Sequence, residues 1–383
     1  MDDILARLRG CLPQGEGPWP LHEPSFQGHE WAYVKDCLDS GWVSSVGAYV
    51  DRFESALSSY TGVAHAVATV NGTAALHIAL LVAGVEPGDE VLVPALTFVA
   101  TSNAIRYCQA TPHFIAADES DLGPDPQALD AYLREILVEI DGQACNAFTG
   151  KPLRALVAMH SFGHPNRLDA LAEICSRYGL TLVEDAAEAL GTRYQGLHVG
   201  HWGRVAALSF NGNKIITTGG GGAVLTNDQD LARRARHLAT TAKVAGHREL
   251  FHDETGFNYR MPNLNAALGL AQMEALNDLL RRKRMLAQRY QEAFVDCSDA
   301  RFVEEPPDAD SNYWLNTLLV GEGVRDALLD RAEKLGIQAR PAWTLQHRLP
   351  MYRYCPSMEM TATERLAARI VNLPSSPNLV GED

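Results

Sequence analysis

Short runs of apolar residues recur along most of the chain, and amphipathic segments separate them. Each run is four to six residues long and apolar almost throughout. Runs of this kind are typical of strands that are buried on both faces of a mainly parallel sheet. The runs cover residues 90–94, 111–116, 155–160, 181–184, 206–210 and 223–226.

Helical patterns fill the intervals between these runs. In residues 168–178, for example, Leu168, Leu171, Ala172 and Cys175 follow i, i+3, i+4 and i+7 spacing, which places them on one helical face. An alternation of strands and helices predicts an α/β fold of the doubly wound type, with a mainly parallel sheet between layers of helices.

A different pattern begins near residue 260. Residues 263–294 are rich in Ala, Leu, Gln, Glu and Arg and contain no glycine after Gly269, which predicts one or two long helices. We therefore expect a large domain over residues 1–260. A smaller C-terminal α/β domain, over residues 261–383, would include the long linking helix.

The composition of the chain limits the kinds of partner and ligand that it can bind. The 383 residues carry a formal net charge of -14, which argues against nucleic acid, because binding to its phosphates relies on clustered Lys and Arg. The seven cysteines show neither a CxxC pair nor a Cys/His ligand spacing, so we expect no metal and no disulfide framework. With no signal peptide and no apolar run of roughly 18 residues, a cytoplasmic protein without a membrane partner is expected.

One lysine stands in a distinctive setting. Lys214 lies between a short apolar strand and four successive glycines, downstream of an apolar segment that ends in Glu184 and Asp185. A lysine amine can condense with the aldehyde of pyridoxal phosphate (PLP), and an acidic partner such as Asp185 can keep the pyridine nitrogen protonated. The alternative for Lys214 is a surface lysine beside a glycine turn. The alternative for Asp185 is an acid at a helix N-terminus, where the helix dipole favours it.

Three further positions fit a cofactor of this kind. Gly72 and Thr73 open an alanine-rich helix after a strand, where free N–H groups and the helix dipole favour a phosphate, although a simple N-cap explains them too. Phe98 follows another strand and could stack on a pyridine ring or belong to the core. Ser209, five residues before Lys214, could donate to the phosphate.

Six motifs in order resemble the DegT-type sugar-nucleotide aminotransferases, a family of fold-type I PLP enzymes. They occupy residues 71–76 (NGTAAL), 87–91 (PGDEV), 94–98 (PALTF), 184–188 (EDAAE), 209–214 (SFNGNK) and 257–262 (FNYRMP). The resemblance implies that Lys214 binds the cofactor and moves the proton between the substrate's Cα and the cofactor, with L-glutamate as the amino donor. Relatives that carry histidine in place of this lysine perform dehydration, so Lys214 favours transamination.

The resemblance also assigns the cofactor's surroundings. Asp185 is implied to pair with the pyridinium and Phe98 to stack on the ring, while Glu188 belongs to the same acidic motif. The implied cofactor-binding set is Gly72, Thr73, Phe98, Asp185, Glu188, Ser209, Lys214 and Asn258. Asn258 would reach the phosphate from the partner subunit, which implies a homodimer with shared active sites. Gly219–Gly222 depart from the family's Gly-Glu-Gly-Gly and remove a carboxylate there.

Segments near the two ends of the chain predict the identity of the substrate. Residues 23–31, 41–47 and 339–352 resemble 4-aminotransferases of the bacillosamine and legionaminic acid pathways, which implies a UDP-linked 4-keto-6-deoxy-N-acetylhexosamine. The candidate substrate-binding residues are His160, Trp42, Arg340 and His347, with Trp31 and Trp343 as further aromatic candidates. His160 follows a strand and could equally be a satisfied core histidine.

Two alternatives remain open from the sequence. One is an aminotransferase for another keto sugar, either a 3-keto or an inositol-type substrate, on the same scaffold. The other is a non-catalytic PLP-binding sensor, although nothing in the chain resembles an attached DNA-binding module.

Overall fold

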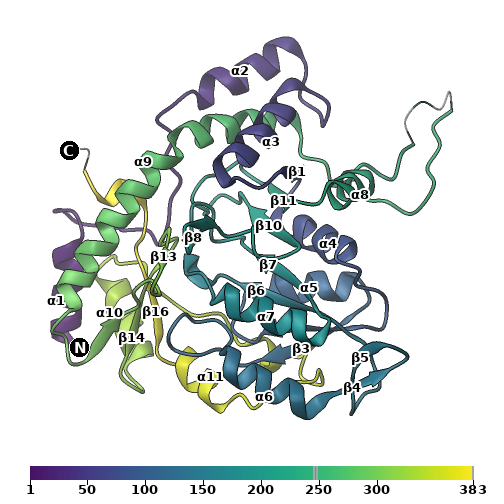
Figure 1. Ribbon diagram of the computed structural model, residues 1–383. Helices are drawn as coiled ribbons and strands as arrows, with labels where there is room; N and C mark the ends of the chain where they lie inside the picture. Colours follow the sequence, from purple (N-terminus) through teal and green to yellow (C-terminus); the bar gives the residue numbers. More distant parts are fainter. Residues whose placement is uncertain (245, 247–248, 382–383) are drawn as a thin grey trace.

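The computed structural model describes residues 1–244, 246 and 249–381. In this part of the chain, a central sheet has seven strands in the order β1-β11-β10-β7-β6-β2-β3 (Figure 1). Strand β11 is antiparallel to both of its neighbours, and the other strands run in one direction, as the apolar runs predict. Their bounds are β1 His65–Thr69, β2 Glu90–Pro94, β3 Thr111–Ile115, β6 Leu153–Met159, β7 Thr181–Asp185, β10 Val205–Ser209 and β11 Gly222–Thr226.

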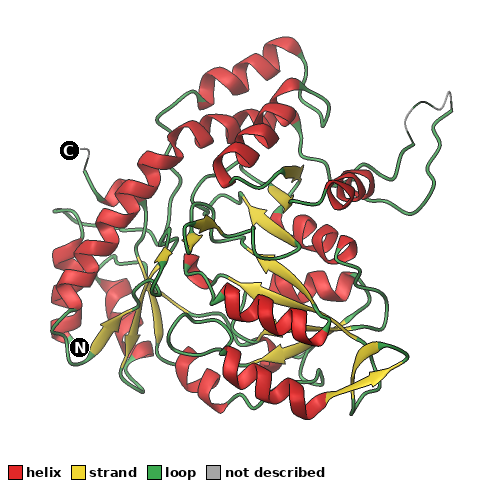
Figure 2. Cartoon of the chain, viewed as in Figure 1, coloured by secondary structure: helices red, strands yellow, loops and turns green. Residues whose placement is uncertain are grey.

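Helices cover both faces of this sheet (Figure 2). Alternate strand residues point to opposite sides, so that Val157 and Val183 belong to one apolar cluster and Leu156 and Leu182 to the other. One cluster also contains α4 (Gly72–Val82), α5 (Val99–Tyr107) and α8 (Gln229–Ala239). The other contains α3 (Ala48–Thr61), α6 (Pro126–Ile136) and α7 (Leu168–Tyr178). The expected α/β architecture is confirmed.

A single 32-residue helix, α9 (Asn263–Phe294), connects the two parts of the molecule. Its first half packs against α2 (Glu30–Ser40) and α3, and its second half packs against α1 (Asp2–Cys11) and β12 (Ala300–Phe302). Beyond α9, β12 joins a second antiparallel sheet in the order β12-β14-β16-β15. Its other members are β14 Asn316–Val320, β15 Arg340–Pro341 and β16 Ile370–Leu373, with α10 Arg325–Lys334 packed nearby.

The start of the chain packs differently from the division expected at residue 260. Ile4 and Leu8 of α1 are buried in the same apolar cluster as Tyr290 of α9 and Phe302 of β12. Trp19 also donates its backbone N–H to the Gly336 carbonyl at 2.8 Å. The first twenty or so residues therefore complete the small domain's core, because the small sheet has an apolar face that the C-terminal segments leave uncovered.

Shorter elements complete the described chain. The hairpin of β4 (Leu137–Ile140) and β5 (Gln143–Asn146) protrudes beyond α6. A small three-stranded sheet brings the two domains together through strands from both. The remaining elements are β8 Arg193–Tyr194, β9 Leu197–His198, β13 Ala309–Asp310, α11 Thr361–Ala367 and the 3-10 turns η1 Ser161–Gly163, η2 Gln346–Arg348 and η3 Pro377–Leu379.

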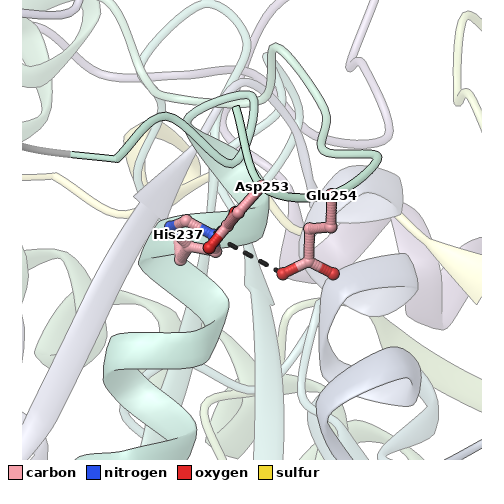
Figure 3. Close-up of side chains that lie close together, drawn as sticks. All are labelled: His237, Asp253 and Glu254. Atoms are coloured by element: carbon pink, nitrogen blue, oxygen red, sulfur yellow. Dashed lines mark hydrogen bonds and ion pairs between the residues drawn. The ribbon is translucent and has the colours of Figure 1, made fainter. Parts of the chain in front are cut away.

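The chain makes a long excursion after α8, which projects away from the body (Figure 1). At its base His237 in the last turn of α8 faces Asp253 and Glu254, with its Nε2 atom 2.7 Å from the Asp253 carboxylate (Figure 3). Arg234 pairs with both oxygens of Glu254, so the local charges already have protein partners. We interpret this group as an anchor for the excursion. Among the described residues, no helix is both long and apolar enough to cross a bilayer.

Candidate active site

The carboxyl ends of the strands that run in one direction meet at a single edge of the central sheet. A cavity of about 330 Å³ opens there, between the large domain and residues of the small domain. Ligands of open α/β sheets bind at this edge, because loops and helix N-termini diverge from it. The cavity is lined by Asn71, Gly72, Thr73, Leu76, Phe98, Ala100, Thr101, Met159, Asp185, Ala187, Glu188, Ser209, Asn211, Asn213, Lys214, Trp314 and Trp343.

Helix α4 points its N-terminus into this cavity. The Asn71 side chain caps the helix by accepting from the Ala74 N–H at 2.7 Å, and the N–H groups of Gly72 and Thr73 lie in the first turn, where no intrahelical acceptor exists. A Cβ atom at Gly72 would come within 2.7 Å of the Ser209 Cβ, so the glycine is what allows β10 and α4 to approach so closely. Gly72, Thr73 and Ser209 thus line one end of the cavity with groups suited to a phosphate.

Asp185 lies at the end of β7, with 1% of its surface exposed. Its carboxylate accepts hydrogen bonds from the Thr101 hydroxyl at 2.7 Å and from the Ala187 N–H at 3.2 Å, both neutral donors. Thr101 is held in turn by Thr97, at 2.8 Å between the hydroxyl oxygens. Burial raises the pKa of Asp185, and a cationic ring nitrogen in the cavity would offset that cost of burial.

Lys214 follows β10 and reaches into the cavity between a carboxylate and an aromatic ring. Its Nζ atom is 3.3 Å from Glu188 Oε1 and 3.8 Å from the centroid of the Trp314 ring. The Trp314 indole N–H donates to the Asn213 carbonyl at 2.6 Å, which fixes the orientation of the ring. Burial raises the pKa of Glu188 to about 7, and the charge of Lys214 opposes this shift. The lysine is therefore inside the site and in contact with Glu188, and Asp185 lines the same cavity.

Aromatic side chains border the opposite side of the cavity. Phe98 keeps half of its surface exposed, and its ring centroid lies 6.4 Å from that of Trp343. Trp343 stacks on Phe162 with the ring centroids 4.8 Å apart. The segment after Trp343 is fastened to the loop of Phe98, since Gln346 donates its side-chain amide to the Thr97 carbonyl. A flat ring between Phe98 and the strand ends would thus contact apolar walls.

Several expected site residues lie outside this cavity. The ring nitrogens of His160 are within 3.2 Å of Glu184 and 3.3 Å of the Asn166 N–H, so it is a satisfied core histidine and does not line the site. His347 pairs with Glu364 at 2.9 Å. Trp42, Arg340 and Asn258 are exposed and are not among the lining residues of this single chain. These side chains lie outside the cavity because the segments that carry them face the surface or the core.

The sequence did not identify some of the residues that line the cavity. Trp314 is 100 positions from Lys214 and reaches it only because the small domain folds back over the sheet edge. Thr101 carried a weak signal, since it lies three positions after Phe98, one helical turn further into the site. Its hydroxyl was not selected because the residues alone do not show which acid it would contact.

The donor set and shape of the cavity fit PLP. A helix N-terminus with a glycine at the point of closest approach suits the phosphate, the buried Asp185 suits a pyridinium nitrogen, and Lys214 supplies an amine at the same edge. Residues 24–383 match the model of the DegT/DnrJ/EryC1/StrS aminotransferase family. The chain belongs to this family.

Related proteins agree with the family match over nearly the full length. GDP-perosamine synthase of Escherichia coli O157:H7 is 37% identical over 368 residues, 95% of this chain and 94% of the relative. GDP-perosamine synthase of Caulobacter vibrioides is 36% identical over 94% of each chain. The crystal structure of the aminotransferase TlmJ from Streptoalloteichus hindustanus superposes with a TM-score of 0.84 at 28% identity, over 94% of each chain.

This member of the DegT/DnrJ/EryC1/StrS family is accordingly a PLP-dependent sugar-nucleotide aminotransferase with the fold of type I aminotransferases. The family implies a nucleotide-linked sugar as substrate and glutamate as amino donor. When bound, PLP acts as an electron sink that stabilises the carbanion formed when a proton leaves the carbon bearing nitrogen.

Proposed function

We propose that this aminotransferase moves an amino group from L-glutamate to the C4 keto carbon of a nucleotide-linked 4-keto-6-deoxy sugar, and that the nucleotide is GDP. The observation that carries the proposal is the cavity that holds Lys214, Asp185 and the N-terminus of α4 together. The names of three relatives at 36–37% identity over at least 94% of the chain support GDP. Resemblance of residues 23–31, 41–47 and 339–352 supports the alternative, a UDP-linked 4-keto-6-deoxy-N-acetylhexosamine.

In this proposal each lining residue has a separate task. Lys214 provides the amine that carries the cofactor and later holds and moves the proton at the substrate carbon. Asp185 keeps the pyridine nitrogen protonated, with Thr101 fixing its orientation at 2.7 Å. Gly72, Thr73 and Ser209 bind the phosphate, while Phe98 stacks against the ring.

Trp343 is the substrate residue that the single chain places best. It lines the cavity beside Phe98 and belongs to the small domain, so a sugar that enters above the cofactor would meet its indole face. Trp42, Arg340 and His347 can contact a substrate only if it extends beyond this cavity or if a second chain closes over it.

A homodimer with shared sites is part of the proposal. Asn258 forms a β-bridge with Thr240 directly after α8 and is exposed, as a residue that reaches a partner's phosphate would be. Large apolar side chains are also exposed on α2 and the loop that follows it, among them Trp31 at 82% and Trp42 at 58%. Large exposed apolar side chains on one segment support burial against another chain.

The deciding experiment offers the purified holoenzyme glutamate with GDP-, UDP- and dTDP-linked 4-keto-6-deoxy sugars and with a 3-keto sugar nucleotide. Release of 2-oxoglutarate and the mass of the amino sugar are measured. Turnover of the GDP sugar at a kcat/KM at least about tenfold above the others, or about 1.4 kcal/mol, supports the proposal. Preference for UDP or a 3-keto sugar overturns the substrate assignment, and bound PLP without any turnover favours the sensor.

A further inference from the structure

We propose that Glu188 is a positioning residue for Lys214: its carboxylate holds the free amine at the cavity wall and takes up the proton that the ammonium must lose before it can act as a base. The proton moves from Lys214 Nζ to Glu188 Oε1, leaving a neutral amine and a neutral carboxylic acid. The inference rests on the assignment of Lys214 as the cofactor-binding lysine.

The first support is the geometry of the pair. Glu188 Oε1 lies 3.3 Å from Lys214 Nζ, and Glu188 is 2% exposed, so its carboxylate is shielded from water. Its other oxygen, Oε2, accepts the Phe162 N–H at 2.9 Å. The carboxylate is thus held at one oxygen by the backbone and presents the other to the amine.

The second support is that the surrounding turn is built around this carboxylate. Phe162 has φ of 59°, a left-handed conformation that is uncommon for an aromatic residue, and this turn aims its N–H at Glu188. At the next position, a Cβ on Gly163 would lie 1.9 Å from the Asn312 Oδ1 atom. Asn312 in turn donates to the Glu188 backbone carbonyl at 2.8 Å. Backbone and side chain of Glu188 are therefore both fixed.

The third support is the balance of charge. Burial raises the pKa of Glu188 to about 7, Lys214 opposes the shift, and the neighbouring Asp185 carboxylate adds to it. Lys214 faces the Trp314 ring on its other side. Burial lowers the pKa of the nearby His22, and the charges of Lys283 and Lys214 add to this effect. A carboxyl that gains or loses its proton near neutral pH is suited to exchange one with an adjacent amine.

The test follows the visible absorbance of the bound cofactor in the holoenzyme as pH is varied, which reports protonation of the nitrogen that Lys214 contributes. Glu188→Gln keeps an oxygen for the Phe162 N–H but removes the negative charge. The midpoint of the titration should then fall by roughly 1–3 pH units, because the protonated nitrogen loses an adjacent anion. The kcat should fall while the KM for glutamate changes little, since Glu188 acts through Lys214.

Two further variants keep the test decisive. Glu188→Asp keeps the negative charge but moves it away from the nitrogen that Lys214 contributes, so the midpoint should fall by less than in Glu188→Gln. This variant replaces Glu188→Gln if that one fails to fold. Asp121→Asn is the matched control, because burial raises the pKa of Asp121 to about 6 and the residue lies outside the cavity. Normal cofactor absorbance with an unshifted midpoint in both Glu188 variants overturns this inference alone. Absence of that absorbance from the unmodified enzyme would instead count against the proposed role of Lys214.

Discussion

Gly72 and Ser209 touch across the end of the central sheet, so that a Cβ on the glycine would lie 2.7 Å from the Cβ of the serine and 2.9 Å from its hydroxyl oxygen. The two residues come from α4 and β10, which are 137 positions apart. Their contact sets the width of the cavity end where the phosphate is proposed to bind.

Gly72→Ala should therefore weaken PLP binding more than it weakens the fold. The added methyl group must displace Ser209 or the helix N-terminus, at a cost of about 1–3 kcal/mol, which corresponds to roughly fivefold to 150-fold in the dissociation constant. Titration of the apoenzyme with PLP measures it. The control is Gly220→Ala, where a Cβ would meet only the Val70 carbonyl at 3.8 Å. Equal affinities in the two variants would contradict the phosphate assignment.

Lys214→Ala should abolish both the visible absorbance of bound cofactor and amino transfer. The phosphate-binding residues and Asp185 remain, so we expect PLP to bind without a covalent link to the protein and to be lost on dialysis. Mass spectrometry after borohydride reduction locates the attachment site in the unmodified enzyme. Lys151→Ala, which removes an exposed lysine at the far edge of the sheet, should behave like the unmodified enzyme.

Asp185→Asn should lower kcat by roughly 10²–10³-fold while PLP remains bound. The amide has the shape of the carboxylate and can still accept from Thr101, but it carries no charge to keep the pyridine nitrogen protonated. Steady-state kinetics with glutamate measure the loss. Asp169→Asn removes a carboxylate that binds the Tyr194 hydroxyl at 2.8 Å outside the cavity, and its kcat should stay within about twofold. A similar kcat in both variants would argue against a role for Asp185 in the chemistry.

The stability of the fold should decline as pH falls from about 6.5 to 4. Burial lowers the pKa of His164 and of His198 to about 4, whereas an unfolded histidine titrates near 6.5. Between these values the unfolded chain binds more protons than the folded one. Each histidine then removes up to about 1.4 kcal/mol of unfolding free energy per pH unit.

Urea unfolding of the unmodified protein and of His164→Asn, measured from pH 7.5 to 4.5, tests this effect. The variant should lose less stability over that range than the unmodified protein does, whatever its stability at pH 7.5. His252→Asn, at an exposed histidine, is the reference for substitutions that leave the slope unchanged. A parallel decline in all three proteins would show that His164 is not the group responsible.

The large domain was largely predictable from local patterns. Residues 90–94, 181–184 and 206–210 are mostly apolar, and they form β2, β7 and β10 because a strand covered by helices on both faces must be largely apolar on both. The start of the chain was not predictable in this way. The apolar residues of α1 indicate a buried face, but not that this face joins the small domain.

The site was predictable where chemistry follows a strand directly. Lys214, Asp185, Gly72 and Phe98 all come within a few residues of a strand end, and the parallel arrangement brings those ends to one edge. His160 also follows a strand, yet it faces Glu184 in the core. The direction of a side chain at such a position depends on the turn that follows, and the residue types alone do not fix it.

The sequence by itself determined the strands, the helices that cover them and the amine and acids available for catalysis, because hydrophobic periodicity and backbone chemistry act over a few residues. Tertiary structure alone decided that Trp314 faces Lys214 and that Glu188 contacts the same amine. It also decided that Phe162 adopts a left-handed turn, which directs its N–H to the Glu188 carboxylate. These contacts join segments far apart in the chain, and their distances depend on how both domains pack around α9.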